Sequence, residues 1–504
     1  MRKPPVTSVV LGVFATLAAI LPLGYLLLRF GQGIDGALVE LLRPRTLELL
    51  GNTLLLVVSV TFTALIIGVF QAWFVVRTKL PLPGLFAVLA TVPLAIPSYV
   101  LALGYISIFP WFSGFFASWL VLSVATAPYV FLAVSAALMR VDVASEEVAR
   151  SLGQNRYQVF FKVTWPQVRT SATAALLLVS LYVLSEFGAI ALLRYDTFTR
   201  AIYNAYRSSF DRTAAASLAV VLVLLTLIIL FFERRYRGDY LKLRPANQKR
   251  QKRNLGGFSA LVISTLSFLA ILGAGLPLLA LLNWSLIGSS SLDLGKLIEA
   301  TLSSAAIAIM ASVLIGLVGL AVAIWVVLHA GKTSRFVESV LWSNHALPAI
   351  VVGLSLVFFG ANVTPGIYQT LWLLLFGYLV LFLPNGLVAM ATPLAQVPSA
   401  LSDVSQSLGK SYRLTLRKVI LPIASPGLIA AFSLIALTVL KELPATLMLR
   451  PTGTETLATR MWQATEDLAY SQAAPYALAL VIIAGLPALA LNASVRRTFE
   501  EVNR

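Results

Sequence analysis

The sequence contains no cysteine and little charge. Of its 504 residues only 12% are Asp, Glu, Lys or Arg, and two are His. The absence of cysteine excludes disulfides, zinc–thiolate sites and iron–sulfur clusters. There is no His-Glu-x-x-His motif and no evident pairing of a nucleophile with a histidine, so the sequence does not favour an enzyme embedded in a membrane.

Apolar residues predominate in the sequence. They make up 59% of the chain, and the mean hydropathy is +0.87. Apolar runs of about 20 residues, long enough to cross a bilayer, recur throughout, which excludes an ordinary soluble globule. Arg2 and Lys3 precede an apolar run that ends at Leu28, and we expect this run to be a span because no clear small-residue cleavage site follows it.

The runs predict an all-α integral membrane protein with about twelve transmembrane helices. The expected spans are residues 8–29, 51–76, 85–109, 117–139, 171–192, 213–232, 257–283, 300–328, 337–360, 368–391, 424–441 and 473–493.

Basic residues orient these spans. The net charge is +17, and 27 of the 38 Lys and Arg fall in segments on one side of the predicted bundle, the side of the N-terminus. This is the positive-inside pattern, so these segments are expected in the cytoplasm, with the chain crossing a membrane many times. Nine of the basic residues lie in 233–256, which we interpret as a cytoplasmic linker touching anionic lipid and not as a nucleic-acid site.

The two sides of this linker are sequence repeats. Residues 46–54 parallel 294–302 at an offset of 248, and a repeated loop described below has an offset of 256. The predicted domains are therefore a first repeat, 1–232, the linker 233–256, and a second repeat, 257–504. Because each repeat has six spans, the two share one orientation and form parallel repeats about a pseudo-two-fold axis along the membrane normal.

The clearest repeated stretch is polar and cytoplasmic. Glu146–Pro166 aligns without a gap on Ser402–Pro422, within loops at 140–170 and 392–423. Gly153 and Gly409 permit a left-handed turn after a short helix, and a second helix is expected to stop at the proline. Each loop is therefore predicted to be a helix-turn-helix.

This stretch resembles the EAA loop of permease subunits of binding-protein-dependent ABC importers (the type I architecture). The resemblance implies that the loop docks into a cleft on a dimer of a separate ABC ATPase at the cytoplasmic face, so that the chain is not itself an enzyme and needs no cofactor, ATP being used by the partner. The second copy has Asp and Ser where Glu and Ala stand in the first. The coupling residues that the resemblance implies are Glu147, Ala149, Gly153 and Pro166, then Asp403, Ser405, Gly409 and Pro422.

Two further features recur within the spans. Pro97 and Pro348 predict kinks, which either line a moving pathway or serve packing alone. Glu186 and Glu442, 256 residues apart, lie near the expected periplasmic ends of two spans. They either flank a cation path or pair locally and fix a helix end.

A metal site is not evident from the residues. His329 lies at a span end and His345 within a span, and either has an ordinary structural explanation. Tyr99, Tyr105, Tyr203 and Tyr206 could contact a metal cation through their phenolate oxygens, but aromatic residues are also common at membrane interfaces.

The segments 93–105, 185–238 and 441–480 look like those of fused, two-repeat permeases of ferric-iron ABC importers and, more distantly, of thiamine permeases. The resemblance covers nearly the whole chain. It implies a multi-pass protein of the bacterial inner membrane, to which a periplasmic binding protein delivers ferric iron, and two halves that alternate in access. The alternatives are thiamine or another small solute as substrate, or an ion-coupled secondary transporter, which would need no ATPase and would leave the twin loops unexplained.

Overall fold

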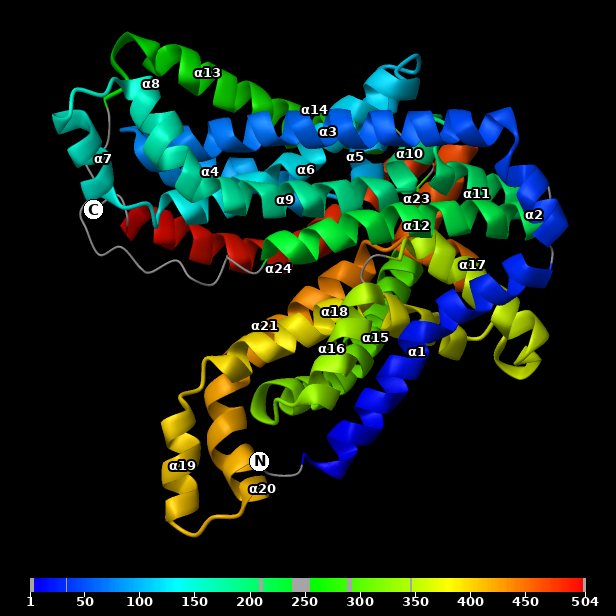
Figure 1. Ribbon diagram of the computed structural model, residues 1–504. Helices are drawn as coiled ribbons and strands as arrows, with labels where there is room; N and C mark the ends of the chain where they lie inside the picture. Colours follow the sequence, from blue (N-terminus) through cyan, green and yellow to red (C-terminus); the bar gives the residue numbers. More distant parts are fainter. Residues whose placement is uncertain are drawn as a thin grey trace. The chain divides into compact units, whose positions relative to one another are not determined.

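The computed structural model describes residues 4–32, 34–207, 212–237, 254–287, 292–344 and 347–501, and these residues form helices joined by turns (Figure 1). Most of the predicted linker lies outside the described residues. The expected all-α fold is confirmed.

Nine helices of the described part are long and apolar enough to cross a membrane. They are Val6–Gln32 (α1), Pro44–Arg77 (α3), Gly114–Leu138 (α6), Arg156–Ser185 (α8 to α9), Thr213–Phe232 (within α12), Gly256–Ile287 (η4 to α14), Leu294–Leu328 (α15), Leu371–Ala395 (α18) and Tyr412–Leu440 (α20 to α21).

The other three predicted spans differ in form. Two are bent pairs of helices: Pro83–Leu94 with Ser98–Ile108 (α5), and Lys332–Asn344 (α16) with Ala349–Asn362 (α17). The last corresponds to the apolar stretch Tyr470–Gly485 at the start of α24 (Tyr470–Glu501). Every predicted span thus corresponds to a helix or to a bent pair of helices in this chain, as expected for an integral membrane protein.

The chain packs into two compact units, and each unit draws on both sequence repeats. The unit that we call the first comprises Leu42–Ala201, Leu224–Leu292 and Gln463–Arg504. The unit that we call the second comprises Met1–Leu41, Ile202–Val223 and Asp293–Trp462. The boundary predicted between the sequence repeats stays a prediction, because the units describe packing and not repetition.

The central helix of each unit is the most buried span. In the first unit this helix is α6, and in the second it is α18, its repeat partner. Small residues let the neighbouring helix approach closely. Gly68 of α3 leaves no room for a Cβ beside Val130 of α6, and Gly319 of α15 lies against the backbone of Gly386 in α18.

The first span of each repeat packs on the core of the other repeat. In the second unit, α1 lies against α15, and a Cβ at Gly12 would meet the Trp325 ring at 2.6 Å. In the first unit, α14 (Leu276–Ile287) lies against α5, where the Trp284 Nε1–H donates to the Ser107 carbonyl at 3.1 Å. Each unit therefore contains the first span of the other repeat. This arrangement depends on close packing at small residues, which the hydropathy of the sequence does not encode.

Candidate functional site: two hairpins and the helix breaks

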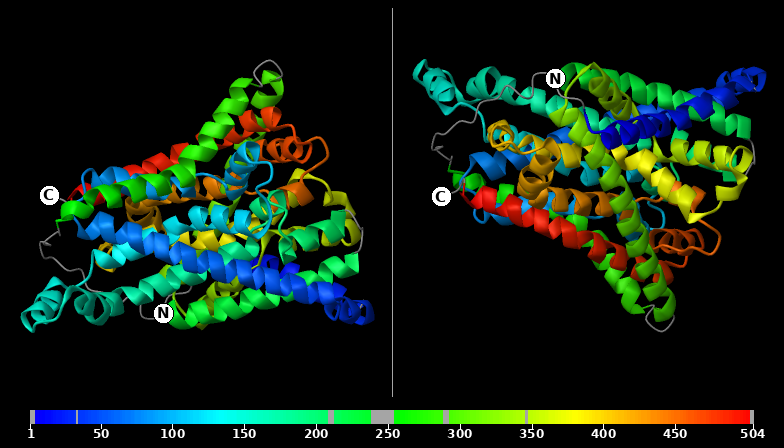
Figure 2. Two further views of the ribbon diagram at one scale, coloured as in Figure 1. Left: turned by 90° about the horizontal axis from the view of Figure 1, so that it is seen from above. Right: turned by 90° about the horizontal axis from the view of Figure 1, so that it is seen from below.

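The first repeated loop is a pair of short helices that projects from the first unit (Figures 1 and 2). We call residues 142–166 the first hairpin. Its first helix, α7, is Val143–Ser151, and Asp142 caps it by accepting from the Ala144 N–H at 3.1 Å. The Ser145 hydroxyl, 2.6 Å away, and the backbone N–H groups hold the pKa of Asp142 below its ordinary value.

Gly153 makes the turn between the two helices. It has φ +79°, and the Gln154 N–H donates back to the Ala149 carbonyl at 3.1 Å, which closes the helix end. The second helix, α8, begins at Arg156 with a capping box in which Asn155 and Gln158 bond each other's backbone N–H. The predicted helix-turn-helix is confirmed.

The second repeated loop has the same shape. We call residues 398–422 the second hairpin; it consists of α19 (Ser399–Ser407) and α20 (Tyr412–Thr415) and projects from the second unit (Figure 1). Gly409 has φ +74°, and the Lys410 N–H donates to the Ser405 carbonyl at 3.2 Å. The repeat therefore preserves the backbone geometry of the turn.

The expectation that each second helix stops at the proline is wrong. Pro166 lies in the first turn of α9 (Trp165–Ser185), and Pro422 in the first turn of α21 (Leu421–Leu440). A wide π-type turn precedes each proline, Phe160–Thr164 (η2) and Leu416–Ile420 (η8). Such a turn shifts the backbone bonding pattern, so a residue without an N–H is accommodated and the helix continues into the membrane.

Both hairpins expose apolar side chains at equivalent positions. Val148 and Val404 are each 58% exposed, and Leu152 and Leu408 are 75% and 72% exposed. They lie on and just after the first helix of each hairpin, beside the glycine turn. Exposed valine and leucine at a protruding tip are typical of a surface that a partner covers.

The predicted coupling residues divide into exposed and packed groups. Exposed residues are Glu147, Gly153, Pro166, Asp403, Gly409 and Pro422. Ala149 lies on the buried face of α7, while Ser405 is half-buried and its hydroxyl lies 2.9 Å from the Thr415 hydroxyl. Their roles toward a partner stay a prediction.

Glu146, which the sequence reasoning passed over in favour of Glu147, is the buried carboxylate of the first hairpin. Its oxygens accept from Arg77 at 2.7 Å, Thr164 at 2.7 Å and Arg150 at 3.2 Å. The two adjacent glutamates, Glu146 and Glu147, indicate in the sequence that one of them is buried, because a short amphipathic helix buries one of two neighbouring residues.

The predicted prolines lie at breaks and not at simple kinks. Pro97 precedes Ser98, the first residue of α5, and the axes of the two helix segments differ by 91°. Pro348 precedes α17, whose axis differs from that of α16 by 101°. Proline favours a non-helical residue before a helix start, so each span is divided where the proline lies.

Glu186 lies at a second break, between α9 and the short helix α10 (Gly188–Leu192). It is buried, and its carboxylate accepts from the Ala189 N–H at 3.0 Å and from the hydroxyls of Ser98 and Tyr182. Since Ser98 directly follows Pro97, the two features predicted separately for the first repeat meet at this carboxylate.

Glu442 occupies the same place in the second repeat, before α22 (Pro444–Leu449). Its oxygens accept from the N–H groups of Ala445 at 2.7 Å and Thr446 at 2.8 Å, and the Thr446 hydroxyl also bonds it. The Tyr378 hydroxyl lies 2.8 Å from the Thr446 hydroxyl. Each carboxylate therefore satisfies backbone donors that a helix start would otherwise leave unpaired. A role of Glu186 and Glu442 in a pathway stays a prediction.

Among the described residues, no group of three His, Asp or Glu side chains is arranged to hold a metal ion. His329 follows α15, and its ring packs edge-on against Tyr412 with centroids 5.0 Å apart. His345 lies outside the described residues. Of the tyrosines, Tyr105 donates to the Leu272 carbonyl at 2.6 Å, and Tyr203 packs on Trp462.

The two hairpins also differ in capping, which gives a prediction. Replacing Asn155 with alanine removes the side-chain oxygen that accepts from the Gln158 N–H, while the backbone N–H of residue 155 can still donate to Gln158, and this is expected to cost about 1 kcal/mol of local stability. Ser411, the equivalent residue, makes no side-chain cap bond, so Ser411→Ala is expected to change little. Protease cleavage rates within each hairpin measure the difference, and equal effects of the two changes would contradict it.

Comparison with known proteins agrees with this geometry. The family model described as the inner membrane component of binding-protein-dependent transport systems matches residues 64–237 and again 315–500, so that each match contains one hairpin.

Individual relatives extend the comparison to the whole chain. The chain is 32% identical over 499 residues to the Fe(3+)-transport system permease protein FbpB 2 of Haemophilus influenzae, covering 97% of this chain and 99% of that protein. It is 22% identical over 395 residues to the ferric transport system permease protein FbpB of Actinobacillus pleuropneumoniae, covering 74% and 57%. It is 26% identical over 223 residues to the molybdate/tungstate permease WtpB of Thermococcus kodakarensis, covering 43% and 89%.

These matches, with the twin hairpins and the membrane-spanning helices, show what kind of protein this is. It belongs to the family of inner membrane permease components of binding-protein-dependent ABC transport systems, in a two-repeat form, and is a transport subunit that works with an ATPase and a substrate-binding protein.

Proposed function

We propose that this chain forms the translocation pathway for ferric iron, delivered by a periplasmic binding protein and driven by an ATPase dimer at the cytoplasmic face. The observation that carries the coupling part is the pair of projecting hairpins with exposed Val148, Leu152, Val404 and Leu408. The substrate part is supported by the similarity, over nearly the whole chain, to a protein named for Fe(3+) transport.

In the proposed mechanism the partner ATPase binds and hydrolyses ATP, and this chain needs no cofactor of its own. Closure of the ATPase dimer draws the two hairpins together. Because α8, η2 and α9 form one continuous helical segment into the membrane, movement of the first hairpin is transmitted directly to a span. ATP drives the change only to the extent that it favours one state over the other.

The route for the ion is also part of the proposal. Pro97 and Pro348 divide their spans, and the buried carboxylates of Glu186 and Glu442 lie at further breaks. Carboxylate oxygens suit a hard cation such as ferric ion, and ionisable groups at membrane depth are often functional. The basic segment 233–256 is proposed to contact anionic lipid, not nucleic acid.

The test is ATP hydrolysis by the complete complex in lipid vesicles. The binding protein is added without substrate, loaded with ferric ion, or loaded with thiamine. We expect stimulation only with the ferric-loaded protein. Stimulation only with the thiamine-loaded protein would overturn the iron assignment and keep the architecture, whereas failure of any ATPase to associate would favour a secondary transporter.

Replacing Gly153 with proline tests the role of the first hairpin in coupling. Proline cannot adopt the φ of +79° found there, so the turn between α7 and α8 must change. The variant is expected to insert into the membrane at the wild-type level but to hydrolyse ATP without uptake. Uptake at the wild-type rate would show that the first hairpin does not transmit the motion.

A further inference from the structure

The two hairpins have similar backbones but are attached to their units in different ways. In the first unit, Arg77 lies at the end of α3 and its guanidinium donates to Glu146 of α7 at 2.7 Å. Thr164, in the π-type turn η2, donates to the same Glu146 oxygen at 2.7 Å. One buried carboxylate therefore ties the hairpin, the turn and the end of a neighbouring span together.

Aromatic packing strengthens this attachment. The Arg77 guanidinium lies 6.0 Å from the centre of the Trp73 ring, and Trp73 packs edge-on against Phe160 of η2 at 5.1 Å between centroids. Phe160 also contacts Trp165 at 6.2 Å. The base of the first hairpin is thus filled with large side chains.

The second repeat lacks every member of this cluster. The motif Val75-Val76-Arg77 aligns with Val326-Val327-Leu328 at an offset of 251, and the loop offset of 256 pairs Glu146 with Ser402 and Thr164 with Ile420. The aromatic positions are aliphatic as well: Ile324 replaces Trp73, Leu416 replaces Phe160, and Leu421 replaces Trp165.

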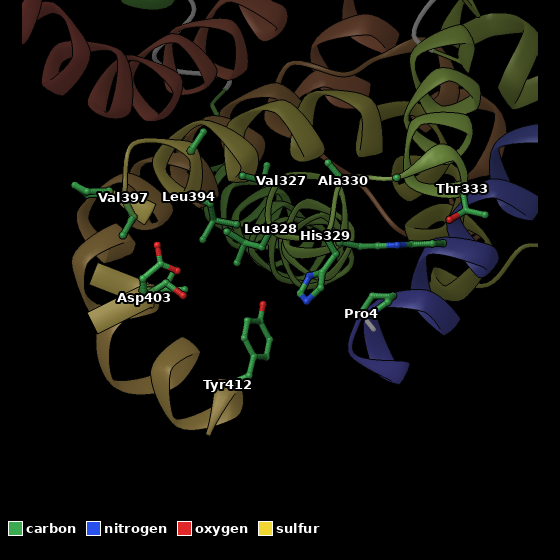
Figure 3. Close-up of a pocket in the computed structure, with 16 residues that line it drawn as sticks. Pro4, Val327, Leu328, His329, Ala330, Thr333, Leu394, Val397, Asp403 and Tyr412 are labelled. Carbon is green, nitrogen blue, oxygen red and sulfur yellow. The ribbon is translucent and has the colours of Figure 1, made fainter. Parts of the chain in front are cut away.

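A cavity of about 760 Å³ lies where the cluster would be. Leu328, Ser402 and Ile420, the three equivalents of the clustered residues, all line it. Figure 3 shows Tyr412 directing its hydroxyl into this space, with Asp403 and His329 on either side. The Tyr412 hydroxyl oxygen is buried and has no hydrogen-bond partner among the described residues. At the base of the second hairpin, the positions that Arg77, Glu146 and Thr164 fill with a bonded cluster in the first hairpin therefore line an open cavity.

We propose that Arg77, Glu146 and Thr164 are positioning residues that fix the first hairpin to its unit, whereas the second hairpin tilts into its cavity when the ATPase partner closes. The inference rests on the proposed function, since it assigns unequal parts in coupling to the two hairpins. A buried carboxylate with three donors holds one geometry, and a hairpin over an open cavity has more than one position available.

Distance measurements between spin labels test the anchor without requiring transport. The chain has no cysteine, so labels can be placed freely. One pair is Ser151→Cys with Phe62→Cys in the first unit, and the equivalent pair is Ser407→Cys with Val313→Cys in the second. All four side chains are exposed. In the complete complex in lipid, we expect a narrow distance distribution for the first pair and a broad one for the second.

Two sets of substitutions should reverse the widths of these distance distributions, one by releasing the first hairpin and the other by fixing the second. Glu146→Gln keeps the side-chain shape but loses charge-assisted bonds, so the fraction of displaced first hairpins should rise roughly 10-fold or more. The graft Leu328→Arg, Ser402→Glu and Ile420→Thr should narrow the distribution of the second pair. Glu48→Gln, an exposed change at the far end of α3, is the control and should alter neither.

Uptake per ATP hydrolysed supplies the second readout. Glu146→Gln should lower this ratio, while ATP hydrolysis itself continues. Equal widths for the two pairs in the wild type, or an unchanged first pair in Glu146→Gln, would overturn the proposal. A wild-type complex that shows unequal widths but no ATP-driven uptake of iron would instead contradict the proposed function and keep the anchor. If Glu146→Gln fails to fold, the graft decides the question alone.

Discussion

Changing Leu152 and Leu408 to aspartate together is expected to abolish capture of the ATPase by this chain. Both leucines are more than two-thirds exposed at the tips of the hairpins. Covering each one in a partner's cleft contributes roughly 2 kcal/mol, so losing both weakens association about 1,000-fold. Co-purification of the ATPase from membranes measures this.

The single variants and a control make this prediction sharper. Leu152→Asp and Leu408→Asp alone should each weaken capture part of the way, because each hairpin meets one ATPase subunit in the proposed complex. Trp111→Asp, an equally exposed apolar position between α5 and α6, should leave capture unchanged. Wild-type capture by the double aspartate variant would show that the hairpin tips are not the docking surface.

The second large effect is expected at Glu442. Alanine there removes the acceptor for the N–H groups of Ala445 and Thr446, which are both buried residues. Leaving such donors unsatisfied should lower the free energy of unfolding by about 3 kcal/mol. Thermal unfolding of the detergent-solubilised protein measures the loss, and Glu186→Ala should show a comparable one because the Glu186 carboxylate likewise accepts from the backbone at a helix start and from neighbouring hydroxyls.

Glutamine at the same positions separates a structural role from a role in transport. Glu442→Gln keeps one carbonyl acceptor and should retain most of the stability. If it also retains uptake, Glu442 serves the helix start alone. If it is stable and loses uptake, the carboxylate charge acts on the cation, as the pathway proposal requires. A stable Glu442→Ala variant would contradict the capping account.

Local features of the fold could be predicted from the sequence, and non-local ones could not. The turns at Gly153 and Gly409 follow from backbone sterics within a few residues, and they are found where expected. The continuation of the helix through Pro166 depends on the π-type turn before it, for which the sequence carries no clear signal. Proline alone therefore predicted a stop that does not occur.

The candidate site shows the same division. The exposed positions of the hairpins could be found from the repeat. The choice between Glu146 and Glu147 required the position of Arg77, almost 70 residues earlier in the chain, because burial of a carboxylate is decided by its partner. Likewise, Glu186 and Pro97 were recognised separately, and only packing of α10 on α5 brings Ser98 to the carboxylate.

Uptake of iron into lipid vesicles by the complete complex tests the central claim most directly. Vesicles containing ATP, this chain and its ATPase are mixed with ferric-loaded binding protein, and internal iron is followed over time. The account predicts uptake that requires ATP and the binding protein and that disappears in the Leu152→Asp, Leu408→Asp variant. Uptake driven by an ion gradient without ATP, or unaffected by that variant, would contradict it.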